Sequence, residues 1–238
     1  GCDFYGMVGT YASHTWPNRK TIGRLGMDFS VISDNIEFLM LGLMRSFQLA
    51  IFTIILSLII SCFIAIGRVS SRRSIRYPSA IFVNLLRSNP LILIVFWFFF
   101  LVPLITGKTL PEFHTVLIAF VVFFAAYFAE IVRSGIQSVG SSQVKAALST
   151  GLTYSQSMRL IVLPQALRNM LPALVTECVI VFQGTTIAYV IGMREFLHST
   201  SLVAERTVRP LELYLFAALV YLVICFAGTR LALFLEKK

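Results

Sequence analysis

Five long apolar segments constrain the fold of this chain more than any other feature. A helix needs about 20 mostly apolar residues to cross the hydrocarbon core of a bilayer, which is roughly 30 Å thick. Segments of that kind cover approximately residues 38–66, 78–105, 113–132, 170–192 and 211–235. We therefore predict an all-α membrane protein whose transmembrane domain, residues 36–236, contains about five transmembrane helices.

The second apolar segment contains a helix break. Arg87, Ser88 and Asn89 precede Pro90 in the middle of the segment. Proline removes a backbone N–H and clashes with the preceding helical turn, so the helix bends or ends there. Broken helices at membrane depth are tolerated where they line a cavity or are buried in protein, so this site is a candidate for function.

The composition supports a membrane protein and argues against a nucleic-acid-binding protein. Hydrophobic residues make up 57% of the chain and charged residues only 13%, whereas soluble domains are about one-quarter charged. The net charge of +9 would suit a nucleic acid. However, the basic residues stand at the ends of apolar segments and not on a polar face of the kind that binds nucleic acid. We expect a lipid bilayer around the chain and no nucleic-acid partner.

Lysine and arginine residues between the apolar segments predict the orientation. Ten of them fall on one side: Arg68, Arg72, Arg73, Arg76, Arg133, Lys145, Arg159, Arg168, Lys237 and Lys238. The other side holds seven, of which four lie in short loops and three in residues 1–26, so only four remain if residues 1–26 are left out. Cytoplasmic loops carry the excess of basic residues, so we predict a cytoplasmic C-terminus and an N-terminus outside.

The N-terminal residues 1–35 form a polar segment. They contain no apolar region of the kind found in a signal peptide. Met27 begins a short polar lead into the first apolar segment. We predict that translation starts at Met27 and that residues 1–26 are misassigned.

A polar segment between the third and fourth apolar segments has the pattern of a capped helix–turn–helix. It runs from Gln143 to Pro164 and reads QVKAALSTGLTYSQSMRLIVLP. Thr153 and Gln156, three residues apart, match a capping box, in which each side chain satisfies a free backbone N–H of a starting helix. Gly151 stands where a helix end favours a positive φ. In the predicted orientation this helix pair faces the cytoplasm, so we expect it to contact a soluble partner.

The same segment resembles the coupling loop, known as the EAA loop, of binding-protein-dependent ABC importer permeases. The pattern Ala-Ala-x3-Gly-x9-Ile-x-Leu-Pro is matched by Ala146, Ala147, Gly151, Ile161, Leu163 and Pro164. The stretches RSNPL at 87–91, AAYFAEIVRSGIQSV at 125–139 and LPQALR at 163–168 resemble motifs of the polar amino acid permeases, the histidine/glutamine/glutamate type. WFFFLVP and QSMRLIVLPQA are most similar to the glutamate/aspartate branch, and the similarity covers about residues 36–236.

This resemblance implies a type I importer permease fold (MetI-like) in the bacterial cytoplasmic membrane. Two permease copies, identical or related, would sit on two ABC ATPase subunits, and a periplasmic or surface binding protein would deliver the amino acid. The chain itself would be no enzyme and would hold no cofactor, because ATP and Mg would bind to the ATPase. Gly107-Lys108-Thr109 agrees with this, since Val102 stands where a P-loop needs its first glycine.

The coupling loop, residues 135–168, would transmit the action of the ATPase. The residues assigned to this role are Lys145, Ala146, Ala147, Gly151, Thr153 and Arg159. Members of the family often carry glutamate at the position of Lys145, so the sign of one docking contact would change here.

Polar residues inside the apolar segments are candidates for the translocation pathway, because ionisable groups there are costly and are functional candidates by default. We assign Arg87, Asn89, Glu177 and Gln183 to this pathway. Glu177 would either contact the substrate or pair with Arg87, and Arg87 would either sit near the cytoplasmic interface or attract a substrate carboxylate. Gln183 would line the pathway or join helices. Glu130 and Arg133, three residues apart, are expected to pair on one helix face, and no cysteine or histidine spacing suggests a metal site.

An ion-gradient-driven secondary amino acid transporter is the alternative function, with Glu130 and Glu177 as ion-coupling sites. No internal repeat of the kind common in such transporters is evident. The substrate stays open: the overall resemblance favours an acidic amino acid, whereas a carboxylate at Glu177 would repel one and suit a cationic or amide side chain.

Overall fold

The computed structural model describes residues 28–236, and all the regular structure in that range is helical. The helices are α2 (Ser30–Asp34), α3 (Ile36–Val69), α4 (Arg73–Arg87), α5 (Leu91–Thr106), α6 (Glu112–Ser138), α7 (Ser141–Ser149), α8 (Tyr154–Ser157), α9 (Leu163–Gly184), α10 (Phe196–Thr207) and α11 (Pro210–Glu236). A π-helical turn, η1 (Met158–Val162), joins α8 to α9, and a 3-10 helix, η2 (Thr185–Ile191), follows α9. Met27 and the residues before it lie outside the described range.

Within that range, four helices are long and apolar enough to cross a membrane, or five if the α4–α5 pair is counted as one span. The four are α3, α6, the continuous helix Tyr154–Ile191 and α11. This confirms the predicted all-α membrane class. The second predicted segment is not a straight crossing, however, because α4 and α5 are bent by 101° at the break before Pro90.

Two further elements differ from the sequence-based expectation. The fourth apolar segment, expected over 170–192, belongs to a helix that already begins at Tyr154 and includes η1. The residues between the fourth and fifth apolar segments, expected to be a short loop, form the 12-residue helix α10. Glu195 is the N-cap of this helix, and its side chain accepts hydrogen bonds from two backbone N–H groups. The pattern of apolar residues does not reveal this cap.

Helix α6 lies at the centre of the bundle and packs along α3. Phe120, Phe124 and Phe128 of α6 are fully or almost fully buried. The facing side of α3 carries small polar residues, including Ser57 and Ser61, which are also buried. Ser57 Oγ donates to the Val121 carbonyl at 3.3 Å. Small side chains of this kind let membrane helices approach closely, and their hydroxyls satisfy backbone groups.

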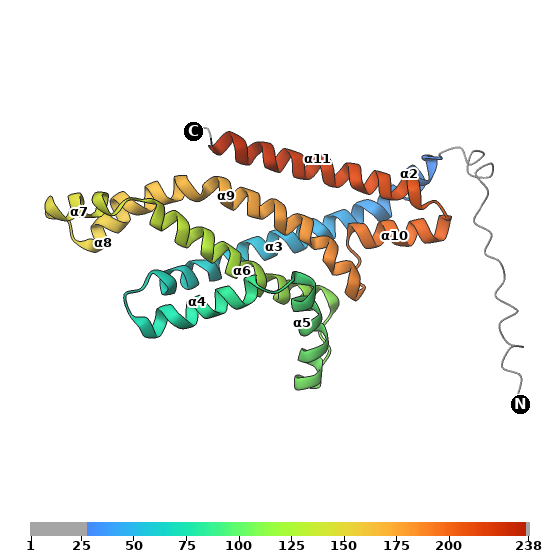
Figure 1. The fold of residues 1–238 in the computed structure, drawn as a ribbon. Helices are drawn as coiled ribbons and strands as arrows, with labels where there is room; N and C mark the ends of the chain where they lie inside the picture. The colour runs from blue at the N-terminus through green and yellow to red at the C-terminus, as the bar shows by residue number, and fades with distance from the viewer. Residues whose placement is uncertain (1–27, 237–238) are drawn as a thin grey trace, which may run out of the picture.

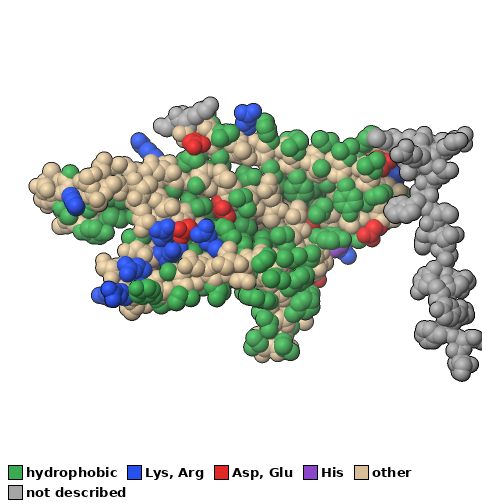
Figure 2. All heavy atoms as spheres, in the orientation of Figure 1, with side chains coloured by type: hydrophobic (Ala, Val, Ile, Leu, Met, Phe, Trp, Pro, Cys, Tyr) green, Lys and Arg blue, Asp and Glu red, His purple; other side chains and the backbone are tan. Residues whose placement is uncertain are grey.

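The outer surface is largely apolar, as expected for a chain surrounded by lipid. Phe63, Leu104 and Ile105 are more than 70% exposed. Figure 2 shows hydrophobic side chains over much of the visible face, with basic side chains gathered around α4 and the nearby part of α6. The α7–α8 pair extends beyond the bundle at one end, and α2 and α10 lie toward the other (Figure 1).

Candidate functional site

The end of α7 is fixed by a glycine in the left-handed conformation. Gly151 has φ +90°. Its N–H donates to the Leu148 carbonyl at 3.1 Å, and the Leu152 N–H donates to the Ala147 carbonyl at 3.3 Å. These two bonds are those of a Schellman motif, which satisfies the free carbonyls of a helix end. The predicted helix end at Gly151 is confirmed.

The start of α8 is fixed by the predicted capping box. The Gln156 N–H donates to Thr153 Oγ1 at 3.3 Å, and the Thr153 N–H donates to Gln156 Oε1 at 2.8 Å. The helix that begins here does not end after α8, because η1 and α9 continue it to Ile191. The second member of the predicted helix pair is therefore the first turn of a membrane-spanning helix.

The α7–α8 pair is seated on α6 and α9 by a small apolar cluster. Val139, Val162 and Ala166 are buried there. Asn169 Nδ2 donates to Ser138 Oγ at 2.8 Å, which joins α9 to the end of α6. Val144 of α7 packs against this cluster, and Gln165 Nε2 of α9 donates to Gln143 Oε1 of α7 at 3.4 Å, so α7 adjoins both the end of α6 and the start of α9.

The residues assigned to coupling are mostly on the outer surface of this pair. Ala147 is buried, whereas the other five are exposed: Lys145, Ala146, Gly151, Thr153 and Arg159. Tyr154 and Leu160 add large apolar side chains that are 61% and 62% exposed. A surface that combines exposed aliphatic and aromatic groups with two cations suits a protein partner.

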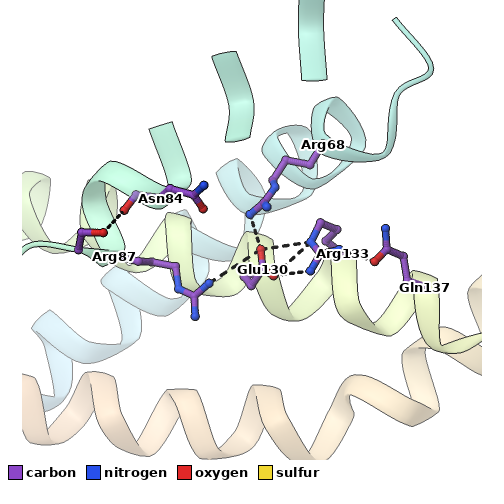
Figure 3. Close-up of polar contacts among 7 residues, drawn as sticks. Arg68, Asn84, Arg87, Glu130, Arg133 and Gln137 are labelled. Carbon is purple, nitrogen blue, oxygen red and sulfur yellow. Dashed lines mark hydrogen bonds and ion pairs between the residues drawn. The ribbon is translucent and has the colours of Figure 1, made fainter. Parts of the chain in front are cut away.

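Glu130 on α6 is surrounded by three arginines (Figure 3). It forms ion pairs with Arg68 of α3 and Arg133 of α6, and Arg87 Nη1 at the end of α4 lies 3.9 Å from its Oε2. The predicted Glu130–Arg133 pair is confirmed. Arg87 also lies over the Tyr127 ring, 5.3 Å from its centroid. This group, which we call the Glu130 cluster, ties α3, α4 and α6 together next to the α4–α5 break.

The other residues assigned to the pathway are placed separately. Glu177 is 7% exposed, and its Oε1 has no hydrogen-bond partner among residues 28–236. Arg87 makes its ion pair with Glu130 and none with Glu177, so the suggested Arg87–Glu177 pair does not form. Gln183 is exposed, and Asn89 is half-buried with its Nδ2 donating to the Leu85 carbonyl at 2.7 Å.

A polar cavity of about 570 Å³ lies at the opposite end of the Tyr154–Ile191 helix from the α7–α8 pair. Arg45 and Gln48 of α3, Glu112 of α6 and Arg194 line it. The sequence points to this cavity only through Arg45, a charge inside the apolar helix α3. Because Arg45 directly precedes the uncharged run that begins at Ser46, the sequence alone indicates only the edge of the first apolar segment at this position.

A buried carboxylate lies beside this cavity. Glu195 is fully buried and accepts from the Leu197 N–H at 2.8 Å and the His198 N–H at 2.7 Å. Ser46 Oγ donates to it at 3.3 Å, and the Tyr221 hydroxyl donates at 3.4 Å. Burial raises the pKa of Glu195 above its ordinary value, while the two backbone hydrogen bonds act in the opposite direction. Its partner Ser46 is remote in sequence, so no local pattern predicts this contact.

Sequence comparison with known proteins finds relatives that are named as permeases. The chain is 34% identical over 218 residues to the glutamate/aspartate import permease protein GltK of Escherichia coli O6:H1, covering 89% of this chain and 97% of the relative. It is 30% identical over 212 residues to the probable glutamine ABC transporter permease protein GlnM of Bacillus subtilis, covering 89% and 98%.

Solved structures show the same fold. A crystal structure of an amino acid ABC transporter with histidines matches with a TM-score of 0.84 at 27% identity, over 90% of this chain and all of that chain. The methionine ABC transporter MetNI in an inward-facing conformation matches with a TM-score of 0.64 at 20% identity, over 85% and 98%. The model of the family described as "Binding-protein-dependent transport system inner membrane component" matches residues 57–238. The chain is therefore a multi-pass membrane protein that belongs to the family of binding-protein-dependent transport system inner membrane components.

Proposed function

We propose that this chain is the transmembrane subunit of an ATP-driven importer that carries a polar amino acid across the bacterial cytoplasmic membrane by alternating access. The observation that carries this proposal is the exposed α7–α8 pair, whose second helix continues without interruption into a membrane span. The names of two relatives, a glutamate/aspartate import permease and a probable glutamine ABC transporter permease, support the class of substrate.

The proposed coupling follows from the packing of this pair. The residues in contact with the ATPase would be Lys145, Ala146, Gly151, Thr153 and Arg159, with Ala147 holding α7 in place from inside. The ATPase subunits bind ATP and Mg, and their closure displaces α7. Because α8, η1 and α9 form one continuous helix, the displacement moves the membrane span as a rigid body.

The proposed topology places residues 135–168, the coupling loop, and the C-terminus in the cytoplasm and the N-terminus outside. A polar segment, 1–35, would precede the transmembrane domain, 36–236. A second permease, identical or related, would complete the transmembrane assembly, and a binding protein would dock on the outer side. This arrangement puts the cavity lined by Arg45 and Arg194 at the outer side.

The proposed translocation pathway includes Glu177 and Gln183 of α9 and Arg87 and Asn89 at the α4–α5 break. Glu177 is the strongest member, because a buried carboxylate oxygen without a hydrogen-bond partner in the described chain needs a functional explanation. A substrate amino group or pathway water would supply the missing partner.

ATP dependence tests the proposed function. The chain is purified with its ATPase and second permease, reconstituted in proteoliposomes, and supplied with the binding protein and radiolabelled amino acids. We expect uptake only with ATP, and a loss of roughly 100-fold or more when the P-loop lysine of the ATPase is replaced by alanine. Uptake driven by a proton or sodium gradient without the ATPase would instead establish a secondary transporter.

A further inference from the structure

The cavity at the far end of the Tyr154–Ile191 helix has the charges needed for an amino acid with an acidic side chain. Its volume of about 570 Å³ lies in the range of small-molecule sites, about 300–1,000 Å³. Its lining includes two positive side chains, Arg45 and Arg194, and one negative side chain, Glu112. An amino acid of the glutamate type carries two carboxylates and one ammonium group at neutral pH, so the charges correspond one to one.

These three side chains are available to a ligand. All three are exposed, and none takes part in a salt bridge within residues 28–236. Arg45 directly precedes the uncharged run of α3 that begins at Ser46, so its side chain lies at the end of this membrane-spanning helix that carries the cavity. Gln48, three residues after Arg45, lies on the same helix face and adds an amide to the cavity wall.

The two arginines are held in place by the buried contacts next to them. Ser46, which follows Arg45, donates to the Glu195 carboxylate at 3.3 Å, and Glu195 follows Arg194. Ser46 Oγ also accepts from the Phe196 N–H at 3.1 Å. These buried hydrogen bonds therefore link the backbone next to Arg45 with the backbone next to Arg194. They fix the distance between the two arginines before a ligand binds.

A close contact of α3 with α10 reinforces this spacing. A Cβ added at Gly42 would lie 2.4 Å from Ser199 Oγ and 3.0 Å from the Glu195 carbonyl oxygen. Only glycine fits there without displacement, so α3 lies directly against the start of α10. Gly192, with φ +81°, ends η2 and turns the chain into the loop before α10.

We propose that this cavity is a binding site for an L-amino acid with an acidic side chain, with Arg45 and Arg194 each pairing with one carboxylate and Glu112 with the ammonium group. This assignment rests on the proposed function and narrows its substrate class. An amide such as glutamine would leave one arginine without a carboxylate, and a cationic amino acid would place a second positive charge near the arginines. Glu177 does not line this cavity, so its carboxylate does not oppose an acidic ligand here.

Ligand binding to the membrane complex tests the site apart from transport. The complex of permease and ATPase is placed in nanodiscs without the binding protein, and equilibrium binding of radiolabelled L-glutamate is measured. We expect L-glutamate to bind at least tenfold more tightly than L-glutamine or L-arginine. Arg45→Gln and Arg194→Gln should each weaken L-glutamate binding by roughly tenfold or more, since each removes a charge-assisted pair. Arg206→Gln, an exposed arginine of α10 that does not line the cavity, is the matched control and should bind as the unchanged protein does.

Three outcomes would overturn the site. These are no measurable L-glutamate binding to the unchanged complex, binding of L-glutamine or L-arginine as tight as that of L-glutamate, or arginine variants that bind L-glutamate within twofold of the control. In the third case, loss of the stimulation of the ATPase by the binding protein would assign the arginines to docking of that protein. ATP-driven uptake by the unchanged complex is measured in parallel. Its presence keeps the proposed function whatever the cavity variants do, and its absence contradicts the proposed function itself.

Discussion

Gly151→Val is expected to abolish most ATP-driven uptake while leaving the protein in the membrane. Gly151 has φ +90° and no atom within 4 Å of an added Cβ, so the effect is backbone strain and not a clash. A β-branched residue at such a φ costs about 1–3 kcal/mol. A cost of this size would break the Schellman motif. The equilibrium between α7 packed on the bundle and α7 displaced from it would shift by roughly 5- to 150-fold.

The glycine at the other end of α7 provides a matched control. Gly140 has φ −57° and ψ 139°, a conformation open to any residue. An added Cβ there would approach only Ser142 Oγ, at 3.4 Å. Gly140→Val should therefore retain uptake within about twofold. ATP-driven uptake and ATP hydrolysis are measured for both variants in proteoliposomes. Equal uptake by the two variants would show that the end of α7 does not transmit the action of the ATPase.

Glu130→Gln is expected to give the largest loss of stability among the carboxylates of the membrane spans. The change leaves Arg68, Arg87 and Arg133 around a neutral side chain. Removing one partner from a buried ion pair costs about 3–5 kcal/mol. The Glu130 side chain is 21% exposed, so we expect about 2 kcal/mol or more, or a fall in melting temperature of roughly 5 °C. Thermal unfolding of the purified protein in detergent measures this.

Glu177→Gln is the contrasting variant. Glu177 makes no ion pair in the described chain, and one of its buried oxygens has no partner, so neutralising it should leave the melting temperature unchanged or raise it. Uptake rate or selectivity should change instead, because the proposed role is contact with substrate. Glu37→Gln, at an exposed position near the start of α3, controls for the loss of one charge. A Glu177→Gln variant with a melting temperature as low as that of Glu130→Gln and unchanged selectivity would assign Glu177 to structure.

The parts of the fold that depend on neighbouring residues could be predicted from the sequence. The capping box at Thr153 and the helix end at Gly151 are local, because all their hydrogen bonds join residues at most five positions apart. The apolar segments were recognisable because a bilayer requires about 20 apolar residues in a row. The same reasoning located the helix break at Pro90 but not its angle of 101°, which is set by packing against other helices.

The parts that depend on distant residues could not be predicted. Glu195 caps α10, but the hydroxyl that fixes it belongs to Ser46, 149 residues earlier. The sequence suggested Glu177 as a partner for Arg87, but α4 packs against α6, and the fold places Arg87 beside Glu130 instead. Arg45 and Arg194 line one cavity only because α3 and the loop before α10 meet in space.

Cross-linking from α7 tests whether the α7–α8 pair contacts an ATPase on the cytoplasmic side of the membrane. The four native cysteines, Cys2, Cys62, Cys178 and Cys225, are replaced by serine, and Lys145→Cys is introduced at an exposed position of α7. A photoactivated thiol cross-linker on that residue is expected to capture the ATPase subunit, and a maleimide that does not cross membranes should fail to label the residue in intact cells. Labelling from outside the cell, or no cross-link to the ATPase in the assembled complex, would contradict the proposed cytoplasmic contact between α7 and the ATPase.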